Sequence, residues 1–175
     1  MINAQDETLN QPDTASSSDR MRATKAPKTK RSNKKKNALK VKRIFSSSQE
    51  SPYDQVEWDK RVAEITDGKG KVIFRQEDVE VPKTWSMLAT NVVVSKYFYG
   101  EQDTNEREYS VRQLIHRVCR TIADWGTKDG YFNKTDGEIF YNELSWLCLN
   151  QYGAFNSPVW FNVGLYHEYG VGRDS

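Results

Sequence analysis

The chain has 175 residues with 26 Lys or Arg and 24 Asp or Glu, and this near balance hides an uneven distribution of charge. Residues 20–43 carry twelve basic and no acidic side chains, whereas residues 44–175 carry 14 basic and 20 acidic ones, so we expect no basic binding face in the body of the chain. The first 19 residues give no support for a secretory signal, and no apolar run approaches the roughly 18 residues of a membrane span.

The leader, residues 1–42, has no aromatic side chain and is rich in Ser, Thr, Asn and Lys. Such a composition buries too little apolar surface to offset the entropy of ordering, so we expect this stretch to be disordered. Its basic run, KTKRSNKKKNALKVKR, could attract nucleic acid electrostatically. Blocks of like charge are more often solvated tails, and we favour that interpretation.

The body of the chain begins near Arg43 with a region of β character. The period of segment 51–66 favours neither a short amphipathic helix nor an extended arm. A turn at 67–70 follows, and the stretch 71–82 alternates apolar and polar residues, which predicts two short strands that end at Pro82. The apolar members of this alternation are Val72, Phe74, Val79 and Val81.

Three helices follow. The first is predicted over 84–100, with Thr84 as N-cap and Gly100 as the stop. Its expected core face consists of Trp85, Leu88, Ala89 and Val92. The second is predicted over 109–126, where Ser110 and Gln113 form a capping-box pattern and Gly126 ends the helix. Its core stripe is Val111, Leu114, Ile115, Val118, Ile122 and Trp125.

The third helix is predicted over 135–153, with Thr135 and Glu138 as a second capping box. Its core side carries Phe140, Leu144, Leu147 and Cys148. Three helices and a small strand pair can bury a modest core. The sequence therefore predicts a mainly α protein of the α+β class.

The residue types that most often carry chemistry have structural interpretations here. His116 and His167 have no second His or Cys at metal-binding spacing, so we expect packing or surface roles and no metal site. Cys119 and Cys148 lie far apart inside apolar segments, where free cysteines usually behave as small hydrophobes. This usage suits a reducing cytosol, and we expect a cytoplasmic protein. Neither a phosphate-binding glycine loop nor a carboxylate pair can be nominated.

The segment FNSPVWFN, residues 155–162, is the exception. Pro158 has no N–H of its own, whereas the hydroxyl and N–H of Ser157 can both meet an external acceptor. Aromatic neighbours would strengthen such a contact by lowering the local dielectric. The alternative is a loop that Trp160 and Phe161 insert into the core, and spacing alone favours it.

Three segments carry a family resemblance. They are residues 70–98, 110–132 and above all AFNSPVWFNVGLYHEYGV at 154–171. Together they closely resemble the N-terminal region of adenosylcobalamin-dependent (class II) ribonucleotide reductases. The motifs stand in family order from about Arg43 to the last residue and do not include the basic leader.

The resemblance implies reduction of ribonucleotides, such as ribonucleoside diphosphates, to deoxyribonucleotides for DNA synthesis. In the family, the cobalt–carbon bond of adenosylcobalamin breaks homolytically, and a cysteine thiyl radical in a ten-stranded α/β barrel abstracts the ribose 3′ hydrogen. Two further cysteines supply the reducing electrons. The barrel and these cysteines are expected beyond residue 175, so no catalytic, metal or cobalamin residue is assigned. The 175 residues alone are expected to be inactive, with the aromatic segment packing against the absent barrel.

Residue by residue, the substrate-binding Ser of the family's Asn-Ser-Pro turn matches Ser157, with Asn156 and Pro158 beside it. The resemblance implies that hydroxyl or main-chain donors there hold the nucleotide. It also implies three parts, namely a disordered leader (1–42), a helical N-terminal reductase domain (43–153) and a truncated start of the substrate-binding and catalytic region (154–175).

The implied partners are a ribonucleotide, the rest of the reductase chain or a complementary fragment, and a thioredoxin-type reductant, with no membrane. A homodimer is left open. The sequence also leaves open whether the chain is a fragment, a split-gene product or a short protein. The rival interpretation is a noncatalytic helical assembly module with a basic nucleic-acid-binding tail.

Overall fold

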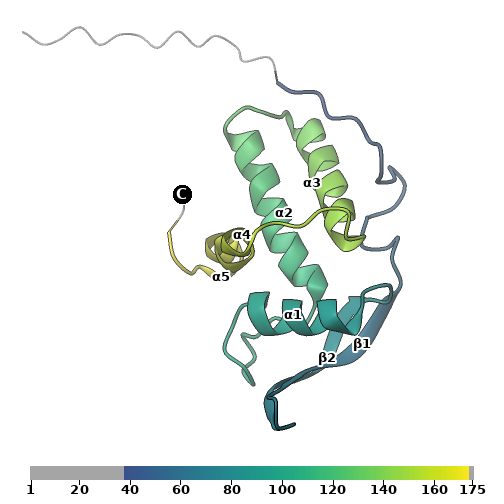
Figure 1. Cartoon of the computed structure of the whole chain (residues 1–175). Helices are drawn as coiled ribbons and strands as arrows, with labels where there is room; N and C mark the ends of the chain where they lie inside the picture. The colour runs from purple at the N-terminus through teal and green to yellow at the C-terminus, as the bar shows by residue number, and fades with distance from the viewer. Residues whose placement is uncertain (1–37, 174–175) are drawn as a thin grey trace, which may run out of the picture. The chain divides into compact units, whose positions relative to one another are not determined.

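The structure, a computed structural model, describes residues 38–173 (Figure 1). These residues form a two-stranded sheet followed by helices that share one hydrophobic core, as the α+β prediction requires. The predicted disorder of the leader lies, for residues 1–37, outside the described residues. Within the described part, no helix is both long and apolar enough to span a membrane.

A β-hairpin opens the element order. Strands β1 (Trp58–Thr66) and β2 (Val72–Pro82) pair antiparallel. Asp67 closes the turn between them, because its Oδ1 accepts the N–H of Lys71 at 2.9 Å. Gly70 has φ +83°, a left-handed conformation that glycine adopts without steric cost.

The hairpin resolves the ambiguity of segment 51–66, which is extended from Trp58 onward. The alternating stretch 71–82 contributes one strand, β2, and its partner β1 precedes the turn. The predicted end at Pro82 is confirmed.

Helix α1 (Met87–Tyr97) begins and ends inside the predicted span 84–100. Its N-cap is Ser86, whose Oγ accepts the N–H of Ala89 at 3.1 Å, so the prediction of Thr84 was wrong. Short polar side chains at either position could cap the helix. The tertiary position of Trp85, which is buried ahead of the helix, decides between them.

The predicted core face of the first helix was wrong in part: Trp85 is buried and Ala89 packs against the core, as predicted, but the other two residues are exposed. Leu88 is 75% exposed and Val92 is 41% exposed, whereas Thr90 and Val94 are buried. Apolar residues occur on all sides of this helix, so their period does not select a face. Contacts with the hairpin select it, since Arg61 of β1 donates to the Thr90 hydroxyl at 3.2 Å.

Helix α2 (Val111–Lys128) confirms the predicted capping box, because Gln113 Oε1 accepts the N–H of Ser110 at 3.1 Å. Of its predicted stripe, the first four residues are buried and the last two are half-buried. Gly126 does not end the helix. A Cβ at this position would overlap the ring of Phe132, so the glycine permits close packing.

Helix α3 (Lys134–Leu149) runs antiparallel beside α2 (Figure 1). Its N-cap is Asn133, whose Oδ1 accepts the N–H of Asp136 at 2.8 Å, and the capping box predicted at Thr135 was wrong. Cys148 is buried, as predicted. The predicted Phe140, Leu144 and Leu147 are half-buried.

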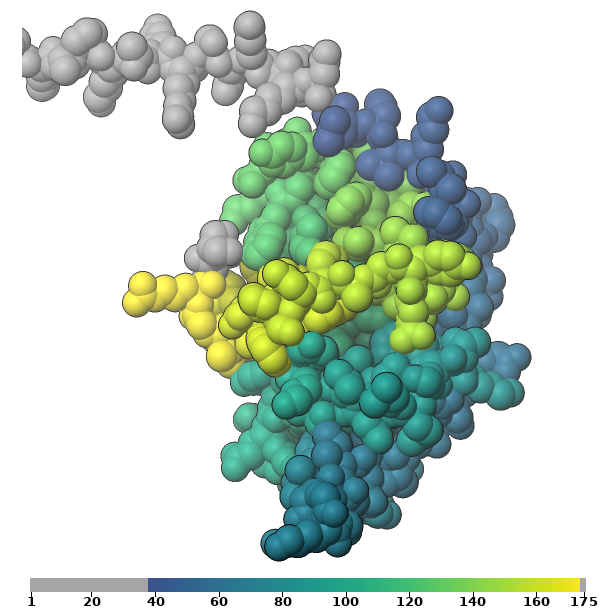
Figure 2. Space-filling view, in the orientation of Figure 1, coloured from purple at the N-terminus to yellow at the C-terminus, as the bar shows by residue number. Residues whose placement is uncertain are grey.

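The segment before the hairpin packs along α3 (Figure 2). The N–H of Leu39 donates to the Tyr131 carbonyl at 2.8 Å, and that of Val41 donates to Asp136 at 3.1 Å. The part of the chain that contacts the helices therefore already includes Leu39 and Val41, which the sequence had placed in the leader.

Glu143 of α3 is the buried anchor of this segment. The residue is 9% exposed, and its carboxylate accepts the N–H groups of Ile44, Phe45 and Ser46 at 3.1, 3.1 and 2.8 Å. Burial raises the pKa of the carboxyl, but the hydrogen bonds from Ser46, Phe45 and Ile44 together bring it below its usual 4.5. The ionised form is therefore the one that fits the fold.

Replacing Glu143 by Gln should lower the free energy of unfolding by about 1.5–3 kcal/mol near neutral pH, because hydrogen bonds to a charged group are lost. A depressed pKa contributes stability above the unfolded value of 4.5 that disappears as pH falls through the folded pKa. The difference between wild type and Glu143→Gln should thus shrink in acid. Urea unfolding at several pH values measures it, and an equal difference at about pH 3 and neutral pH would contradict the prediction.

Candidate functional site

The predicted Asn156-Ser157-Pro158 turn lies at the start of the short helix α4 (Ser157–Asn162). Asn156 and Pro158 are exposed and Ser157 is half-buried. The Ser157 hydroxyl lies 3.0 Å from the hydroxyl of Tyr97 on α1, and either oxygen can donate. The structure therefore places the three predicted residues together at the surface, with the serine side chain oriented by a tyrosine.

The aromatic residues that follow the turn have different environments. Trp160 is 8% exposed, and its ring packs 5.2 Å from Phe155 and 6.5 Å from Tyr97. The expectation that this segment needs a barrel to pack against was therefore wrong for Trp160, which enters the core of this chain. Phe161 remains 46% exposed, so insertion into the core is confirmed for Trp160 alone.

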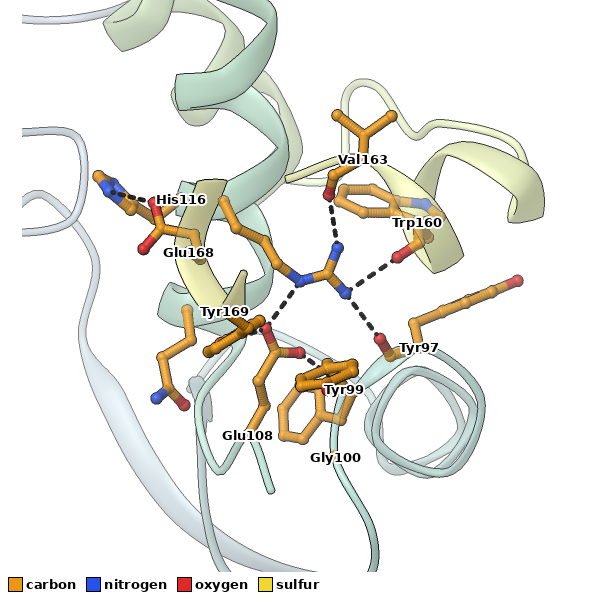
Figure 3. Close-up of polar contacts among 12 residues, drawn as sticks. Tyr97, Tyr99, Gly100, Glu108, His116, Trp160, Val163, Glu168 and Tyr169 are labelled. Atoms are coloured by element: carbon orange, nitrogen blue, oxygen red, sulfur yellow. Dashed lines mark hydrogen bonds and ion pairs between the residues drawn. The ribbon is translucent and has the colours of Figure 1, made fainter. Parts of the chain in front are cut away.

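Arg117 of α2 holds this segment in place through hydrogen bonds to residues labelled in Figure 3. Its side chain is 1% exposed and donates to three main-chain carbonyls. Nη1 bonds Val163 at 2.8 Å, while Nη2 bonds Trp160 at 2.9 Å and Tyr97 at 3.0 Å. One guanidinium thus ties the end of α1 and the end of α4 to α2.

Glu108 neutralises this buried cation. Its Oε1 accepts from Arg117 Nε at 2.8 Å and from the hydroxyl of Tyr169 at 2.9 Å, and its Oε2 accepts the N–H of Tyr99 at 2.8 Å (Figure 3). Burial and the neighbouring carboxylate raise the pKa of Tyr169. Tyr169 ends the short helix α5 (Leu165–Tyr169), so the ion pair also fixes α5.

The main chain at Gly164, between α4 and α5, also lies directly against the main chain of α2. Gly164 has φ +86°, and a Cβ there would overlap the carbonyl of Arg117. On α5, Glu168 lies 3.8 Å from Nε2 of His116, whose Nδ1 lies 2.6 Å from the hydroxyl of Tyr141. His116 thus has protein partners on both ring nitrogens.

A cavity of about 330 Å³ opens beside the turn. Its walls combine aromatic and aliphatic residues from α1, α2, α3 and α4 and from the segments that precede α1 and α4. They include Trp85, Tyr97, Cys148, Phe155 and Trp160. The volume lies at the lower end of the range of small-molecule sites.

The described residues offer no metal site. Among residues 38–173, no group of three or more His, Cys, Asp or Glu side chains could hold a metal ion. The ring of His167 packs edge-on against Trp125, in keeping with the expected packing role.

Sequence reasoning missed Arg117, Glu108 and Tyr97. Arg117 stands next to Val118 of the predicted stripe, and a charged side chain at such a position is normally assigned to solvent. Arg117 is buried because it pairs with Glu108. Glu108 precedes α2, so the apolar period of that helix gives no sign of the pair. The sequence feature that could have revealed Arg117 is the position of this arginine between Ile115 and Val118 of the predicted core stripe.

Comparison with known proteins identifies the family. Residues 59–151 match the family model of the class II vitamin B12-dependent ribonucleotide reductases. The chain belongs to this family. The match covers the hairpin and helices α1 to α3 and stops short of the Asn156-Ser157-Pro158 turn. The family resemblance of the sequence is thereby confirmed, and the chain corresponds to the N-terminal region of these reductases.

Curated relatives agree with this assignment. The chain is 62% identical over 126 residues to the vitamin B12-dependent ribonucleotide reductase of Rhodopirellula baltica, an alignment that covers 71% of this chain and 12% of that reductase. It is 42% identical over 149 residues to the enzyme of the same name from Streptomyces coelicolor, covering 84% of this chain and 14% of the relative. The chain therefore spans about an eighth of the length of these reductases.

The buried ion pair of this reductase region can be tested by a double-mutant cycle. Arg117→Met should lower the free energy of unfolding by about 3–5 kcal/mol, because it leaves the Glu108 carboxylate buried without its cation. Adding Glu108→Gln should recover part of the loss. Arg120→Met is the control, since Arg120 pairs with the exposed Glu138 and should cost no more than about 1 kcal/mol. Urea unfolding measures Arg117→Met, Glu108→Gln, the double variant and the control, and additive losses in the cycle would contradict the coupling.

Proposed function

We propose that the chain forms the N-terminal part of an adenosylcobalamin-dependent ribonucleotide reductase. Such an oxidoreductase converts ribonucleoside diphosphates to deoxyribonucleotides for DNA synthesis through a thiyl radical, and bound adenosylcobalamin supplies the radical chemistry. Family membership and the position of the match in the relatives support this proposal. The described residues contribute positioning of the Asn-Ser-Pro turn.

We propose the same domain organisation that the sequence indicates. Residues 43–153 form the helical N-terminal domain, residues 154–175 begin the substrate-binding region, and the part of the leader that precedes the contacts of Leu39 and Val41 is a solvated tail. The contacts of Arg117 support a close connection between the two ordered parts, because they join α2 to α4. The remaining partners are the rest of the reductase chain or a complementary fragment, and a thioredoxin-type reductant in the cytoplasm.

The nucleotide contact that we propose is made by Ser157. The observation that carries it is the hydrogen bond between the Ser157 and Tyr97 hydroxyls at a turn whose other members, Asn156 and Pro158, are exposed. A hydroxyl can accept one hydrogen bond while it donates another. When Tyr97 donates, the Ser157 proton is available to an oxygen of the nucleotide, and a charged phosphate oxygen makes the stronger acceptor.

Replacing Ser157 by Ala in the full-length reductase should raise KM for the ribonucleotide about tenfold to a hundredfold, because a hydrogen bond to a charged group is worth about 1.5–3 kcal/mol. Steady-state kinetics measures the effect. Ser157→Thr keeps the hydroxyl and should retain most of the affinity. Tyr97→Phe removes only the orienting partner and should have a smaller effect than Ser157→Ala. Unchanged affinity in Ser157→Ala would refute the assigned contact.

The 175-residue chain alone should form no deoxyribonucleotide from a ribonucleotide supplied with adenosylcobalamin and a dithiol. The physical reason is that both cysteines of the described residues are buried, so no exposed pair of thiols can deliver reducing electrons to a substrate. Chromatography of the nucleotides after incubation is the measurement, with a complete vitamin B12-dependent reductase as the positive control. Turnover by the purified chain would show that the chemistry is complete within it.

A further inference from the structure

Three aromatic side chains from segments far apart in sequence form a row near the C-terminal end of α3. The ring of Phe45 stacks on that of Trp146, with 5.1 Å between the ring centroids and 18° between the planes. Tyr152 continues the row on Trp146 at 5.5 Å. Phe45 is 45% exposed and Tyr152 is 75% exposed, whereas Trp146, which contacts both, is half-buried. The aromatic row, Phe45, Trp146 and Tyr152, therefore presents its two outer rings to solvent.

Main-chain hydrogen bonds hold both outer rings in place. The N–H of Phe45 donates to the buried carboxylate of Glu143 at 3.1 Å. After α3, Gln151 adopts a left-handed conformation with φ +58°, and the N–H of Tyr152 then donates to the carbonyl of Leu147 at 2.9 Å. The row is thus fixed by the backbone before a partner binds, which reduces the entropy lost on binding.

The surface around the aromatic row is basic, unlike the rest of the body. Residues 38–49 and 144–156, the two segments that build it, carry no acidic side chain and three basic ones, namely Lys40, Lys42 and Arg43. Lys42 is exposed, and the side chain of Lys40 is 78% exposed although it pairs with a carboxylate of α3. Glu143, which precedes the second segment, is buried and bonded to main-chain N–H groups. A negatively charged partner is therefore attracted to this surface, whereas the excess of acidic side chains in the rest of the body disfavours it elsewhere.

Exposed aromatic rings bordered by cations suit one class of partner. The bases of a single-stranded nucleic acid have flat faces that stack on aromatic side chains, and its phosphates pair with Lys and Arg. In a duplex the bases are already paired and stacked, so they cannot extend the row. An apolar protein surface could cover the rings but would leave the cations without a counterion. The charge of this surface therefore favours nucleic acid.

We propose that the aromatic row is a stacking site for the bases of single-stranded nucleic acid, with Lys42 and Arg43 beside it as contacts for the phosphates. Residues 20–37, which precede this site in the sequence, contain nine further basic side chains, and a solvated tail of that charge attracts phosphates from a distance. The site uses none of the residues proposed to contact the substrate. It does not depend on the reductase reaction, and the resemblance to the family does not assign it.

The test is the fluorescence anisotropy of a labelled oligothymidylate of about 16 nucleotides, titrated with the full 175-residue chain. The single strand should bind at least about fivefold more tightly than a duplex of the same length at the same salt concentration, because only unpaired bases can stack on the rings. A basic tail alone gives the opposite order, since the duplex has the higher charge density. The logarithm of the binding constant should fall with the logarithm of the salt concentration by about 0.7 for each phosphate contacted. An oligouridylate of equal length, measured in parallel, shows whether the site prefers DNA or RNA.

Variants of the outer rings separate stacking from charge. Phe45→Leu and Tyr152→Leu keep an apolar side chain but remove the ring, so each should weaken binding of the single strand about fivefold to a hundredfold. Tyr152→Phe keeps the ring and should bind as the wild type does. Tyr109→Leu is the matched control, because Tyr109 is 58% exposed but lies outside the row, and it should leave the affinity unchanged. Lys42→Gln should reduce the salt dependence by about one phosphate contact. Circular dichroism establishes that all variants are folded.

Several outcomes would overturn the proposal. They are no binding at low salt, a duplex that binds as tightly as the single strand, and a loss of affinity in Tyr109→Leu as large as in Tyr152→Leu. Wild-type affinity in both Phe45→Leu and Tyr152→Leu would also refute it, because all binding would then belong to the basic side chains. None of these outcomes bears on the contact proposed for Ser157, whose test is the KM of the full-length reductase.

Discussion

The ion pair between Arg117 and Glu108 is the interaction on which the arrangement of the helices depends. Moving two charges out of water costs several kcal/mol for each ion, so such a pair persists only where further hydrogen bonds satisfy it. Here the guanidinium donates hydrogen bonds to carbonyls at the ends of α1 and α4. The last carbonyls of a helix have no hydrogen-bond partner within the helix, so they are free to accept. The carboxylate takes a main-chain N–H and the hydroxyl of Tyr169. Helix ends from three parts of the chain thus satisfy one buried pair.

The ion pair also determines the position of Ser157, the residue proposed to contact the nucleotide. Tyr97 gives its carbonyl to Arg117 and its hydroxyl to Ser157, so the turn is placed relative to α2 through a single residue of α1. Gly164 lets the chain after α4 lie directly on the α2 backbone, where any side chain would collide. The turn is therefore fixed from both sides by a rigid helix although its own members are largely exposed. A reductase can in this way present a surface serine in one orientation.

A second polar group lies in the same core between α2 and α3. The hydroxyl of Tyr53 donates to the hydroxyl of Ser145 on α3, and Cys148, one turn further along the same helix, lines the cavity. Phe155 and Trp160 line that cavity too, so this part of α3 and the segment around the Asn156-Ser157-Pro158 turn face the same space. The outward apolar residues of α1, Leu88 and Val92, take no part in either group.

Local patterns in the sequence determined a good part of this structure. They predicted the extent of α2 and its capping box, the approximate span of α3, the strand that ends at Pro82, and the family, because capping, periodicity and motif order are properties of neighbouring residues. Only the tertiary structure decided which face of α1 is buried, since its apolar residues surround the helix. It alone showed that Arg117 is buried against Glu108 and that the carbonyls of Trp160 and Val163 reach its guanidinium, because these contacts depend on partners distant in sequence whose approach follows from packing and not from period.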